Sequence, residues 1–455
     1  MSDSVSEYTL LVVESPTLAA RLQLIAPDNV YVLATGGFLW KPIYDPKNGR
    51  LGKKAIPDKL DLRNELRREA RHAVHIIVAT DSDPSGDFIA WTIHKELQSK
   101  AIKRAQLAAI SKAALSQLLR HAIEIDFSAL YKRLQNRYRI RHKWSDHFPG
   151  ISMQDAGMLS VFGNPITLSE FRSKEGHRFF STQVVTVRLN HTQWPAERIS
   201  GPGWSVASPL SSFDAVAGLR ASLGLSSFTV AQSLLQRTFE ATHPQTGNGL
   251  ITYPRTESRS FFNSSWDNLQ HQWIKKHSLN EFMPANLREV TDSAAAHDAI
   301  RPVHMDVSPD WVERHLPSDI GRVYRFIHSR TLECIRLPEP AVSVFRQTDG
   351  DLEFISSSAI KKPSVNLRPF LTMSELGRQL CSLGVIRPSG AGTFFDEAIK
   401  KNKIRRLDSG EIKPGESVNK YSERGQSFSV ILKNLRLVAD KPELNDETIE
   451  RILSS

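Results

Sequence analysis

The chain opens with a block of hydrophobic residues, Tyr8 to Val13, whose length suits one buried strand. The block ends at Glu14, and it is followed by Ser15, which suits a helix N-cap, and Pro16, which suits the first helical position. Residues 18–25 then predict the helix itself. A strand leading directly into a helix is typical of an α/β unit, and Glu14 stands at the carboxyl end of the strand, where such sheets bind ligands. The alternative for this glutamate is a solvated loop residue.

A second hydrophobic block, His75 to Ala79, predicts another buried strand, and a helix is predicted to run on to Leu97. Between them lie Asp81 and Asp83, two carboxylates two residues apart at the end of a strand. Such a pair can bind one hard cation through oxygen, because Mg²⁺ typically takes one or two carboxylates and fills its other positions with water and phosphate. Ordinary turn chemistry before Gly86 is the alternative for both residues.

The same patterns continue along the chain and predict both helices and strands. Residues 60–71 predict a basic helix, residues 107–125 predict a strand followed by an amphipathic helix, and residues 135–143 predict a helix with Arg137 and Arg139 among aromatic side chains. A basic helix with aromatics suits single-stranded nucleic acid, although a solvated helix face is the alternative. Strands are predicted at 179–189, 197–206, 339–346 and 352–357, and helices at 213–223, 228–241 and 320–334. The fold class is therefore expected to be multidomain α/β and α+β.

Composition narrows the class of protein. At 455 residues the chain is long enough for several domains, and its net charge of +10 suits a polyanionic partner. Only Cys334 and Cys381 are present, which argues against a disulfide framework and a zinc ribbon. The first residues lack the features of a signal peptide, and no apolar run approaches the roughly 20 residues of a membrane helix. These features predict a cytoplasmic, soluble protein with no membrane partner.

Residues 249–258 carry the most distinctive candidate chemistry. Leu250 to Thr252 are extended in type, and Pro254 excludes helix and favours an extended Tyr253. Side chains two apart share a face in an extended chain, so Tyr253 and Arg255 are expected to point the same way. A guanidinium beside a phenol favours the phenolate and can bind a phosphate oxygen, which would suit nucleophilic attack by Tyr253. The alternative is a half-buried strand tyrosine beside a surface arginine.

The run Gly-Leu-Ile-Thr-Tyr-Pro-Arg-Thr-Glu-Ser at 249–258 resembles the active-site signature of the type IA DNA topoisomerases at every defined position. Glu14 and the Asp81-x-Asp83 pair, with their flanks, resemble the signature of the Toprim domain of that family. Residues 295–302, Ala-Ala-His-Asp-Ala-Ile-Arg-Pro, and residues 371–389, which end in Arg387-Pro-Ser389, resemble two further family motifs in the expected order.

The chain departs from the family pattern at four places. Ser85 stands where a third acid is common, and Leu18 stands where a lysine is common. Gly36-Gly37 replaces a usual Gly-His pair, and residues 150–159 lack the arginine of a family motif near the cleavage point. One fewer carboxylate weakens metal affinity, and fewer basic side chains weaken the hold on a phosphate.

The resemblance implies a toroidal type IA topoisomerase architecture with a Rossmann-like Toprim domain, compact and without C-terminal zinc ribbons. The implied domains are a Toprim domain at 1–145, a basic DNA-binding gate domain at 146–178 and 366–455, a linker sheet at 179–212 and 335–365, and a helical domain at 213–334 that carries Tyr253.

The resemblance also implies residue roles. Tyr253 would attack single-stranded DNA and form a transient 5′-phosphotyrosine, Arg255 would stabilise the phosphoryl charge, and Glu14 would act as general acid and base. His297 would contact the phosphate or relay a proton. Mg²⁺ would be held by Asp81, Asp83 and Glu14, and DNA by residues of several segments: Arg137, Arg139, Arg301, Arg387 and Ser389.

The implied enzyme relaxes negative supercoils or decatenates DNA without ATP, in keeping with the lack of a Gly-x-x-x-x-Gly-Lys-(Ser/Thr) phosphate loop in the sequence. A monomer is expected. The departures above motivate an alternative, a catalytically weakened relative that binds single-stranded DNA. A Toprim nuclease or primase is a further alternative, against which the intact tyrosine motif argues, since neither uses a tyrosine nucleophile.

Overall fold

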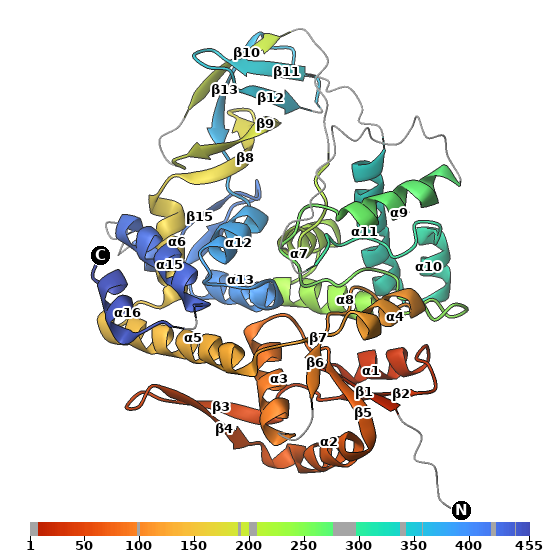
Figure 1. Ribbon diagram of the computed structural model, residues 1–455. Helices are drawn as coiled ribbons and strands as arrows, with labels where there is room; N and C mark the ends of the chain where they lie inside the picture. The colour runs from red at the N-terminus through yellow and green to blue at the C-terminus, as the bar shows by residue number, and fades with distance from the viewer. Residues whose placement is uncertain are drawn as a thin grey trace, which may run out of the picture. The chain divides into compact units, whose positions relative to one another are not determined.

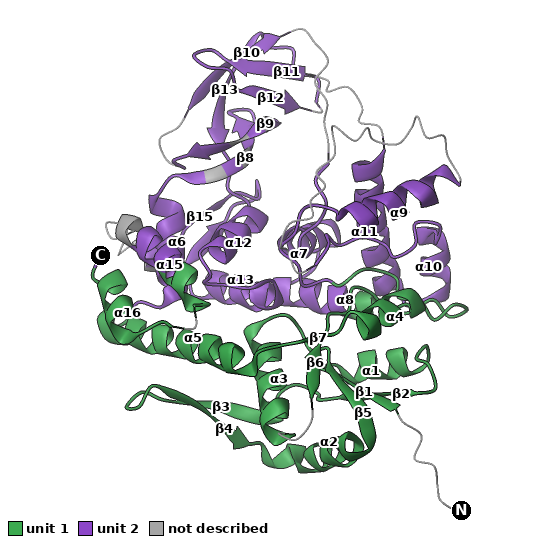
Figure 2. Ribbon diagram, in the orientation of Figure 1, with its two compact units in different colours: residues 1–150, 237–253, 435–454 green, residues 151–236, 254–434, 455 purple. Residues whose placement is uncertain are grey.

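The computed structural model describes residues 8–97, 101–189, 193–199, 207–275, 297–336, 343–356, 358–419, 425–441 and 443–455. The chain divides into two compact units (Figure 2). Unit 1 comprises residues 1–150, 237–253 and 435–454, and unit 2 comprises residues 151–236, 254–434 and 455. Unit 1 is therefore built from three separate stretches of the chain, one of which ends at Tyr253.

A five-stranded sheet forms the centre of unit 1, with the strand order β2-β1-β5-β6-β7 (Figure 1). Its strands are β1 (Tyr8–Val13), β2 (Val30–Ala34), β5 (Ala73–Val78), β6 (Ile102–Arg104) and β7 (Ile123–Glu124). The pairs β1–β2, β1–β5 and β5–β6 are parallel, and only β7 runs antiparallel to its neighbour. The predicted Rossmann-like α/β organisation is confirmed.

The first predicted strand and helix are confirmed in detail. Helix α1 (Pro16–Gln23) begins after Ser15, whose Oγ accepts the backbone N–H of Leu18 at 3.2 Å. Leu10 and Val12 of β1 are fully buried, and Ile76 and Val78 of β5 lie in the same hydrophobic core. Both faces of β1 are covered, which is why its sequence reads as a continuous apolar run rather than an alternating one.

The remaining elements of unit 1 surround this sheet. They are the hairpin β3 (Trp40–Asp45) and β4 (Arg50–Ala55), the 3₁₀ turn η1 (Pro57–Lys59), and the helices α2 (Leu60–His72), α3 (Pro84–Glu96), α4 (Lys112–Arg120), α5 (Phe127–His147) and α16 (Asp446–Leu453).

The prediction for residues 107–125 was partly wrong. The helix is present as α4, but residues 107–111 form no regular strand. Their backbone pairs instead with a distant stretch of the chain: Tyr253 N–H donates to Ala108 O at 2.9 Å, and Gly249 N–H donates to Ile110 O at 2.5 Å. The partner lies more than 130 positions away in the sequence, so local patterns carry no sign of it.

Six strands of unit 2 form a closed barrel, with the strand order β10-β11-β12-β9-β8-β13. Its strands are β8 (Ile166–Ser173), β9 (Arg178–Val187), β10 (Trp194–Ile199), β11 (Ser343–Gln347), β12 (Glu353–Ser356) and β13 (Ser364–Pro369). Buried aromatic rings fill it: Phe171 meets Phe354 with ring centroids 5.1 Å apart, and Phe179 meets Phe345 at 5.4 Å. The barrel includes β8 and most of β13, which the sequence-based boundaries assign to the gate domain.

Helices make up most of the rest of unit 2. They are α6 (Met153–Gly163), α7 (Ser212–Ser222), α8 (Phe228–Glu240), α9 (Asn263–Ile274), α10 (Pro309–His315), α11 (Ser318–Ile335), α12 (Met373–Ser382), α13 (Ala391–Lys400), α14 (Glu416–Asn419) and α15 (Gly425–Ala439). The 3₁₀ turn η4 (Pro388–Gly390) and the hairpin β14 (Ile404–Arg406) and β15 (Ile412–Pro414) complete it. The last turns of α8 and α15 belong to unit 1.

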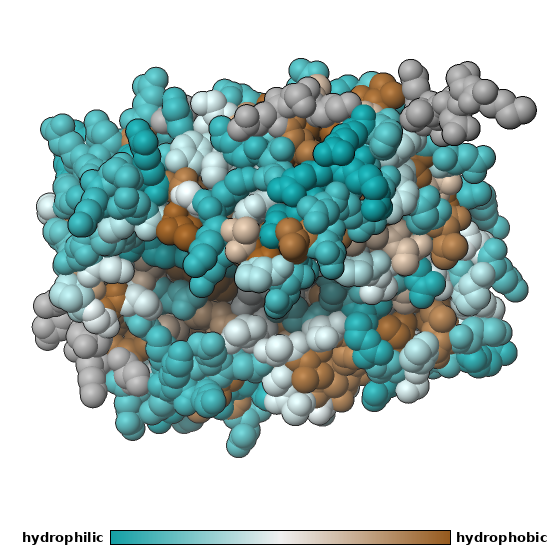
Figure 3. Space-filling model, turned by 90° about the horizontal axis from the view of Figure 1, so that it is seen from below, coloured by the Kyte–Doolittle hydropathy of each residue, from teal (hydrophilic) through white to brown (hydrophobic). Residues whose placement is uncertain are grey.

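The surface is largely polar where it can be followed. On the face seen in Figure 3, hydrophobic residues form separate groups among hydrophilic ones, as is usual for a protein surface in contact with water. Within the part of the chain that the structure describes, every helix is too short or too polar to cross a bilayer.

Candidate active site

The carboxyl ends of β1 and β5 bring the predicted acidic residues to one edge of the sheet. The two strands are parallel neighbours, with Val12 opposite Val78, and Ala79 N–H donates to Val12 O at 2.7 Å. Glu14 follows β1 directly, and Asp81 and Asp83 lie on the loop that follows β5. All three acidic residues are half-buried. The strand ends that carry the three acidic residues therefore lie side by side in the sheet.

Asp83 has a structural role in this loop. One carboxylate oxygen, Oδ1, accepts the backbone N–H groups of Ser85 and Gly86, each at 2.9 Å. Asp83 is thus the N-cap of α3, with Pro84 in the first turn. The turn chemistry that the sequence left open as an alternative is present, and a role in metal binding would have to coexist with it.

Close backbone packing fixes the shape of the same loop. A Cβ on Gly86 would lie 2.0 Å from Asp81 O, so only glycine fits there without movement of the backbone. Thr80 is buried and its Oγ1 donates to Gly86 O at 2.9 Å. Asp81 and Asp83 are therefore carried on a loop whose two ends are held together by packing and by hydrogen bonds.

Arg104, at the end of β6, is a residue of this region that sequence reasoning missed. Its guanidinium donates to Asp87 Oδ1 at 3.1 Å, to Asp81 O at 3.3 Å and to both oxygens of Thr80. Burial lowers the pKa of Arg104, and it raises the pKa of Asp87 although the nearby arginines act in the opposite direction. The guanidinium places one fixed positive charge beside the loop that carries the acids. No short motif marks it, because Arg104 lies more than 15 positions from every partner.

Lys59 is a second basic residue at this edge that the sequence did not indicate. Its ammonium group donates to Gly36 O at 2.8 Å and Thr35 O at 3.3 Å, in the turn that follows β2. Gly36 N–H in turn donates to Glu14 O at 2.8 Å. Position 18 lacks the lysine that the family pattern has, and the half-buried Lys59 brings an ammonium group close to the same Glu14 turn from another part of the chain.

Tyr253 is buried and belongs to unit 1, as do Glu14, Asp81 and Asp83. Its ring packs edge to face against Phe239, with centroids 5.6 Å apart and planes at 85°. Its backbone is tied to Ala108, as described above. The nucleophile predicted from the sequence therefore lies in the same compact unit as the three acids.

The residues that follow the tyrosine belong to unit 2 and are tied to α7. Ser212 Oγ donates to Pro254 O at 2.5 Å and accepts Thr256 N–H at 2.8 Å, while Ser212 N–H donates to Thr256 O at 2.8 Å. Arg255 lies between them and is half-buried. The shared orientation of Tyr253 and Arg255 stays a prediction.

A half-buried carboxylate anchors the end of this segment. Asp214 of α7 lies 2.7 Å from Arg378 of α12 and 3.3 Å from Arg259. Burial alone raises the pKa of Asp214, but the charges of Arg378 and Arg259 outweigh it and hold the pKa at about 2. Asp214 is therefore ionised at neutral pH and links α7, α12 and the segment after the tyrosine by paired charges.

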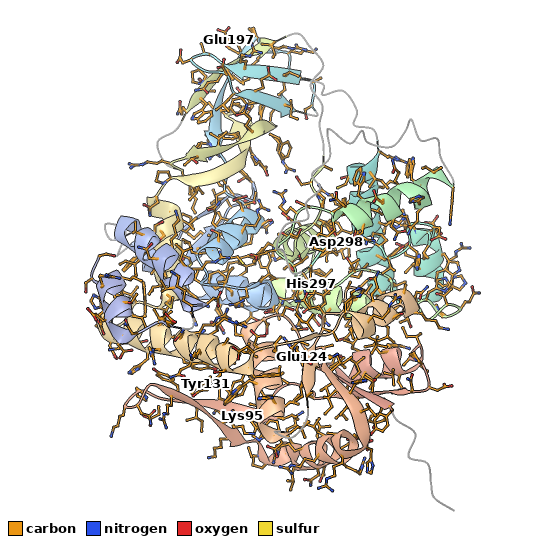
Figure 4. The ribbon with its side chains drawn as sticks, viewed as in Figure 1. Lys95, Glu124, Tyr131, Glu197, His297 and Asp298 are labelled. Carbon is orange, nitrogen blue, oxygen red and sulfur yellow. The ribbon has the colours of Figure 1, made fainter. Side chains whose placement is uncertain are left out.

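His297 and Asp298 lie next to each other in the predicted motif at 295–302 (Figure 4), of which residues 295 and 296 fall outside the described residues. Burial lowers the pKa of His297 to about 4, so its ring is neutral at pH 7. Arg301 is buried and donates to Asp298 Oδ2 at 2.9 Å, Ser265 Oγ at 3.0 Å and Pro302 O at 3.0 Å. The guanidinium predicted to bind DNA thus has several partners within unit 2, and its role in DNA binding stays a prediction.

The motif that ends in Arg387-Pro-Ser389 is also set in unit 2. Arg387 is exposed and precedes η4, and Ser389 is half-buried. The side chain of Gln232 on α8 donates to Ser389 O and accepts Gly392 N–H at 2.6 Å, which fixes the turn against α8. An exposed guanidinium on a fixed turn is suited to contact a phosphate.

The predicted basic helix is α5, but its cations have acidic neighbours from the end of the chain. Arg137 lies 2.8 Å from Asp440, and Arg139 lies 3.3 Å from Asp446 and donates to Leu444 O at 2.8 Å. Lys143 lies 2.8 Å from Glu450. These acids lie at 440–450, more than 290 positions away from α5, so the sequence of the helix alone could not predict the pairing.

Two regions of the chain match known protein families. Residues 9–110 match the Toprim domain, and residues 219–348 match the DNA topoisomerase family. Toprim domains typically bind metal. Among the described residues, no three His, Cys, Asp or Glu side chains are grouped closely enough to form a metal site by themselves. The groups that could bind a cation are half-buried carboxylates at the carboxyl edge of the sheet, among them the pair Asp81 and Asp83. Such a pair of carboxylates fits Mg²⁺, which keeps several water and phosphate ligands.

Several DNA topoisomerases 1 are similar in sequence. That of Rickettsia prowazekii is 21% identical over 71% of this chain and 50% of its own length, that of Pseudomonas aeruginosa is 25% identical over 76% and 43%, and that of Thermotoga maritima is 22% identical over 80% and 63%. The chain spans about half the length of the curated relatives it matches. The solved structure of full-length topoisomerase I from Thermotoga maritima is 17% identical and has the same fold, with a TM-score of 0.67 over 98% of this chain and 89% of that one.

Proposed function

We propose that this chain, which matches the Toprim domain over residues 9–110 and the DNA topoisomerase family over residues 219–348, is an ATP-independent type IA DNA topoisomerase. It would cleave one strand of DNA through Tyr253, allow another strand to pass, and reseal the break. The observation that supports this most is that Tyr253 and the acids Glu14, Asp81 and Asp83 belong to one compact unit, with the complete ten-residue tyrosine motif around the nucleophile. The substrate would be DNA with a single-stranded segment at the cleavage site.

The proposed cleavage is a transesterification. Tyr253 gives its phenolic proton to water, its oxygen forms a bond to phosphorus, and the bond from phosphorus to the 3′ oxygen of the upstream nucleotide breaks. Glu14 gives a proton to that leaving oxygen, which becomes a 3′ hydroxyl, and takes the proton back when the hydroxyl attacks the phosphotyrosine. Because the number of phosphoester bonds is unchanged, resealing needs no ATP.

Other residues would lower the barrier by charge and position. Arg255 would hold a non-bridging phosphate oxygen through its planar guanidinium. Mg²⁺ held by Asp81 and Asp83, with Glu14 beside them, would supply positive charge for the phosphate. His297 is neutral at pH 7, so its contribution would be a hydrogen bond rather than a charge. Arg137, Arg139, Arg301, Arg387 and Ser389 would bind the DNA backbone. We further propose that the enzyme acts as a monomer in the cytoplasm.

Covalent trapping tests this proposal. The protein and its Tyr253→Phe variant are incubated with Mg²⁺ and a single-stranded oligonucleotide labelled at either end, and the mixture is stopped with denaturant. A 5′-phosphotyrosine keeps the downstream fragment, so the 3′ label should migrate with the protein and the 5′ label should appear on a shorter free fragment. The Tyr253→Phe variant should bind the oligonucleotide equally well by fluorescence anisotropy and give no adduct.

The opposite result would favour the alternative function. Oligonucleotide binding without any adduct, over several sequences and divalent metals, would identify a relative that binds single-stranded DNA and no longer cleaves it. The departures at Leu18, Ser85 and residues 150–159 make this the second candidate.

A further inference from the structure

A side-chain hydrogen bond ties the stretch 237–253, which ends at Tyr253, to the turn that follows β1. Ser15 Oγ donates to Glu240 Oε1 at 2.8 Å. The same oxygen accepts Leu18 N–H as the N-cap of α1. A hydroxyl has a single proton to donate, so the capping contact uses it as an acceptor and leaves that proton for Glu240. Glu240 therefore bonds to the residue directly after Glu14.

Glu240 is also the sequence neighbour of the ring that packs on the nucleophile. Phe239 lies edge to face against Tyr253, and both rings are buried. Edge-to-face pairs of this kind stabilise two rings beyond what their burial alone contributes. The end of α8 thus makes two adjacent contacts, one from Phe239 to the nucleophile and one from Glu240 to the turn that carries Glu14.

The other end of the stretch is held by its backbone. Gly249 and Tyr253 donate their N–H groups to Ile110 and Ala108. A Cβ on Gly249 would lie 3.1 Å from Ile110 Cβ and 3.2 Å from Ile110 O, so the approach is as close as glycine permits. The stretch is therefore fixed to unit 1 at both ends, through backbone at one end and through Glu240 at the other.

We infer that Glu240 is a positioning residue for Tyr253, an inference that rests on the proposed function. Its bond to Ser15 fixes the position of the end of α8 relative to the turn that carries Glu14. Phe239 lies at that end of α8 and packs against the Tyr253 ring, so the same bond helps to position Tyr253. Loss of the bond removes neither the nucleophile nor any DNA-binding side chain. It makes the position of Tyr253 relative to Glu14 less fixed. Cleavage should then slow while the affinity for DNA is kept.

Four variants test the inference in the full chain: Glu240→Ala, Glu240→Gln, Ser15→Ala, and Glu240→Ala combined with Ser15→Ala. The glutamine carbonyl can still accept the proton of Ser15, so Glu240→Gln should form the covalent adduct at nearly the wild-type rate. Glu240→Ala should slow adduct formation about tenfold, the effect of losing one hydrogen bond of about 1.4 kcal/mol, with unchanged oligonucleotide affinity. Glu397→Ala, which removes an exposed glutamate paired with Lys401, is the matched control and should behave as wild type.

A second measurement keeps the test independent of catalysis. Hydrogen exchange of the amides of residues 249–253 should be faster in Glu240→Ala than in wild type and unchanged in Glu240→Gln. The effects of Glu240→Ala and Ser15→Ala on the rate of adduct formation should not add, because the two residues act through one bond. The double variant should therefore form the adduct as fast as whichever single variant is slower.

Two results would overturn the inference: an adduct rate for Glu240→Ala within twofold of wild type, or equal slowing by the alanine and glutamine variants. A wild-type protein that forms no adduct would instead refute the proposed function. In that case unchanged amide exchange in Glu240→Ala would also refute the positioning role, whereas faster exchange would support the link itself.

Discussion

Arg137 of α5 lies 2.8 Å from Asp440, so an arginine predicted to bind DNA is paired with an acid from the end of the chain. The neighbouring Arg139 and Lys143 have partners in the same stretch, at Asp446 and Glu450. The acids are well exposed, with 60% of the Asp440 side chain and 59% of the Asp446 side chain accessible to solvent. Exposed pairs of this kind contribute little to stability, about 0–1 kcal/mol each, but they offset the positive charge that α5 presents to a polyanion.

Neutralising the acids should strengthen DNA binding. We expect Asp440→Asn combined with Glu450→Gln to raise the affinity for a single-stranded oligonucleotide severalfold and to make it more sensitive to salt, because cations that were paired become available to phosphates. Anisotropy titrations between 50 and 200 mM salt measure both quantities. The control is Asp310→Asn with Glu313→Gln, which removes two acids paired with Arg325 and makes the same change in net charge. Equal effects of both double variants would refute a specific role of α5.

Asp83 should show two separable roles. Asp83→Ala removes the cap of α3 and should lower the free energy of unfolding by about 1 kcal/mol, whereas Asp83→Asn keeps a good capping side chain and should preserve stability. Both variants remove the charge, so both should raise the Mg²⁺ concentration needed for adduct formation. Denaturant unfolding and a Mg²⁺ titration of trapping give the two readouts. An Asp83→Asn variant with unchanged Mg²⁺ dependence would restrict this residue to its capping role.

His297 should make stability depend on pH. Its pKa is lowered to about 4 in the folded chain from the ordinary histidine value of 6.5, so between these values the unfolded state binds more protons. Stability should therefore fall as pH decreases from about 6.5 towards 4, with a contribution from this residue of about 2 kcal/mol at pH 5. Unfolding of wild type and His297→Gln at pH 7 and pH 5 measures it: the difference between the two proteins should shift by that amount in favour of the variant at pH 5.

Gly86→Ala should distort the loop that carries Asp81 and Asp83. The added Cβ would meet Asp81 O at 2.0 Å, so the backbone has to shift, at a cost on the order of 1–3 kcal/mol. Gly52→Ala is the control, because its Cβ would lie 3.6 Å from the nearest atom, an ordinary contact. Denaturant unfolding should show a loss for Gly86→Ala well above that for Gly52→Ala, and the trapping assay should show reduced adduct. Similar stability of the two variants would contradict the packing described for this loop.

Lys59 should contribute one phosphate contact. Loss of one contact to a single strand lowers the slope of log affinity against log salt by about 0.7, and we expect this change for Lys59→Ala. Lys95→Ala removes an equally charged, exposed lysine of α3 and should leave the slope unchanged. Adding Leu18→Lys to Lys59→Ala should restore part of the slope, because position 18 lies on the helix directly after the Glu14 turn. A Lys59→Ala variant with the wild-type slope would remove this lysine from the DNA-binding surface.

Local sequence predicted much of unit 1. The apolar run of β1, the Ser15 cap and the Pro16 start act within a few residues of one another, and each is present in the structure. The capping role of Asp83 is equally local, since its partners are two and three positions away. The tyrosine motif and the acids of the sheet could be named as candidates for the same reason, because their residue types and short spacings suit the proposed chemistry.

Contacts between distant residues were decided by the tertiary structure alone. The acids opposite α5, the carbonyls of residues 107–111 that bind the Tyr253 stretch, and Arg104, Lys59 and Glu240 all meet partners that lie far away in the sequence. A hydrogen bond or ion pair depends on distances of about 3 Å between side chains, and such distances arise only when the sheet and its helices have packed. The sequence by itself therefore determined which residues are candidates for the proposed cleavage of DNA. The folded chain decided which of these residues lie close together and which are already paired with other side chains.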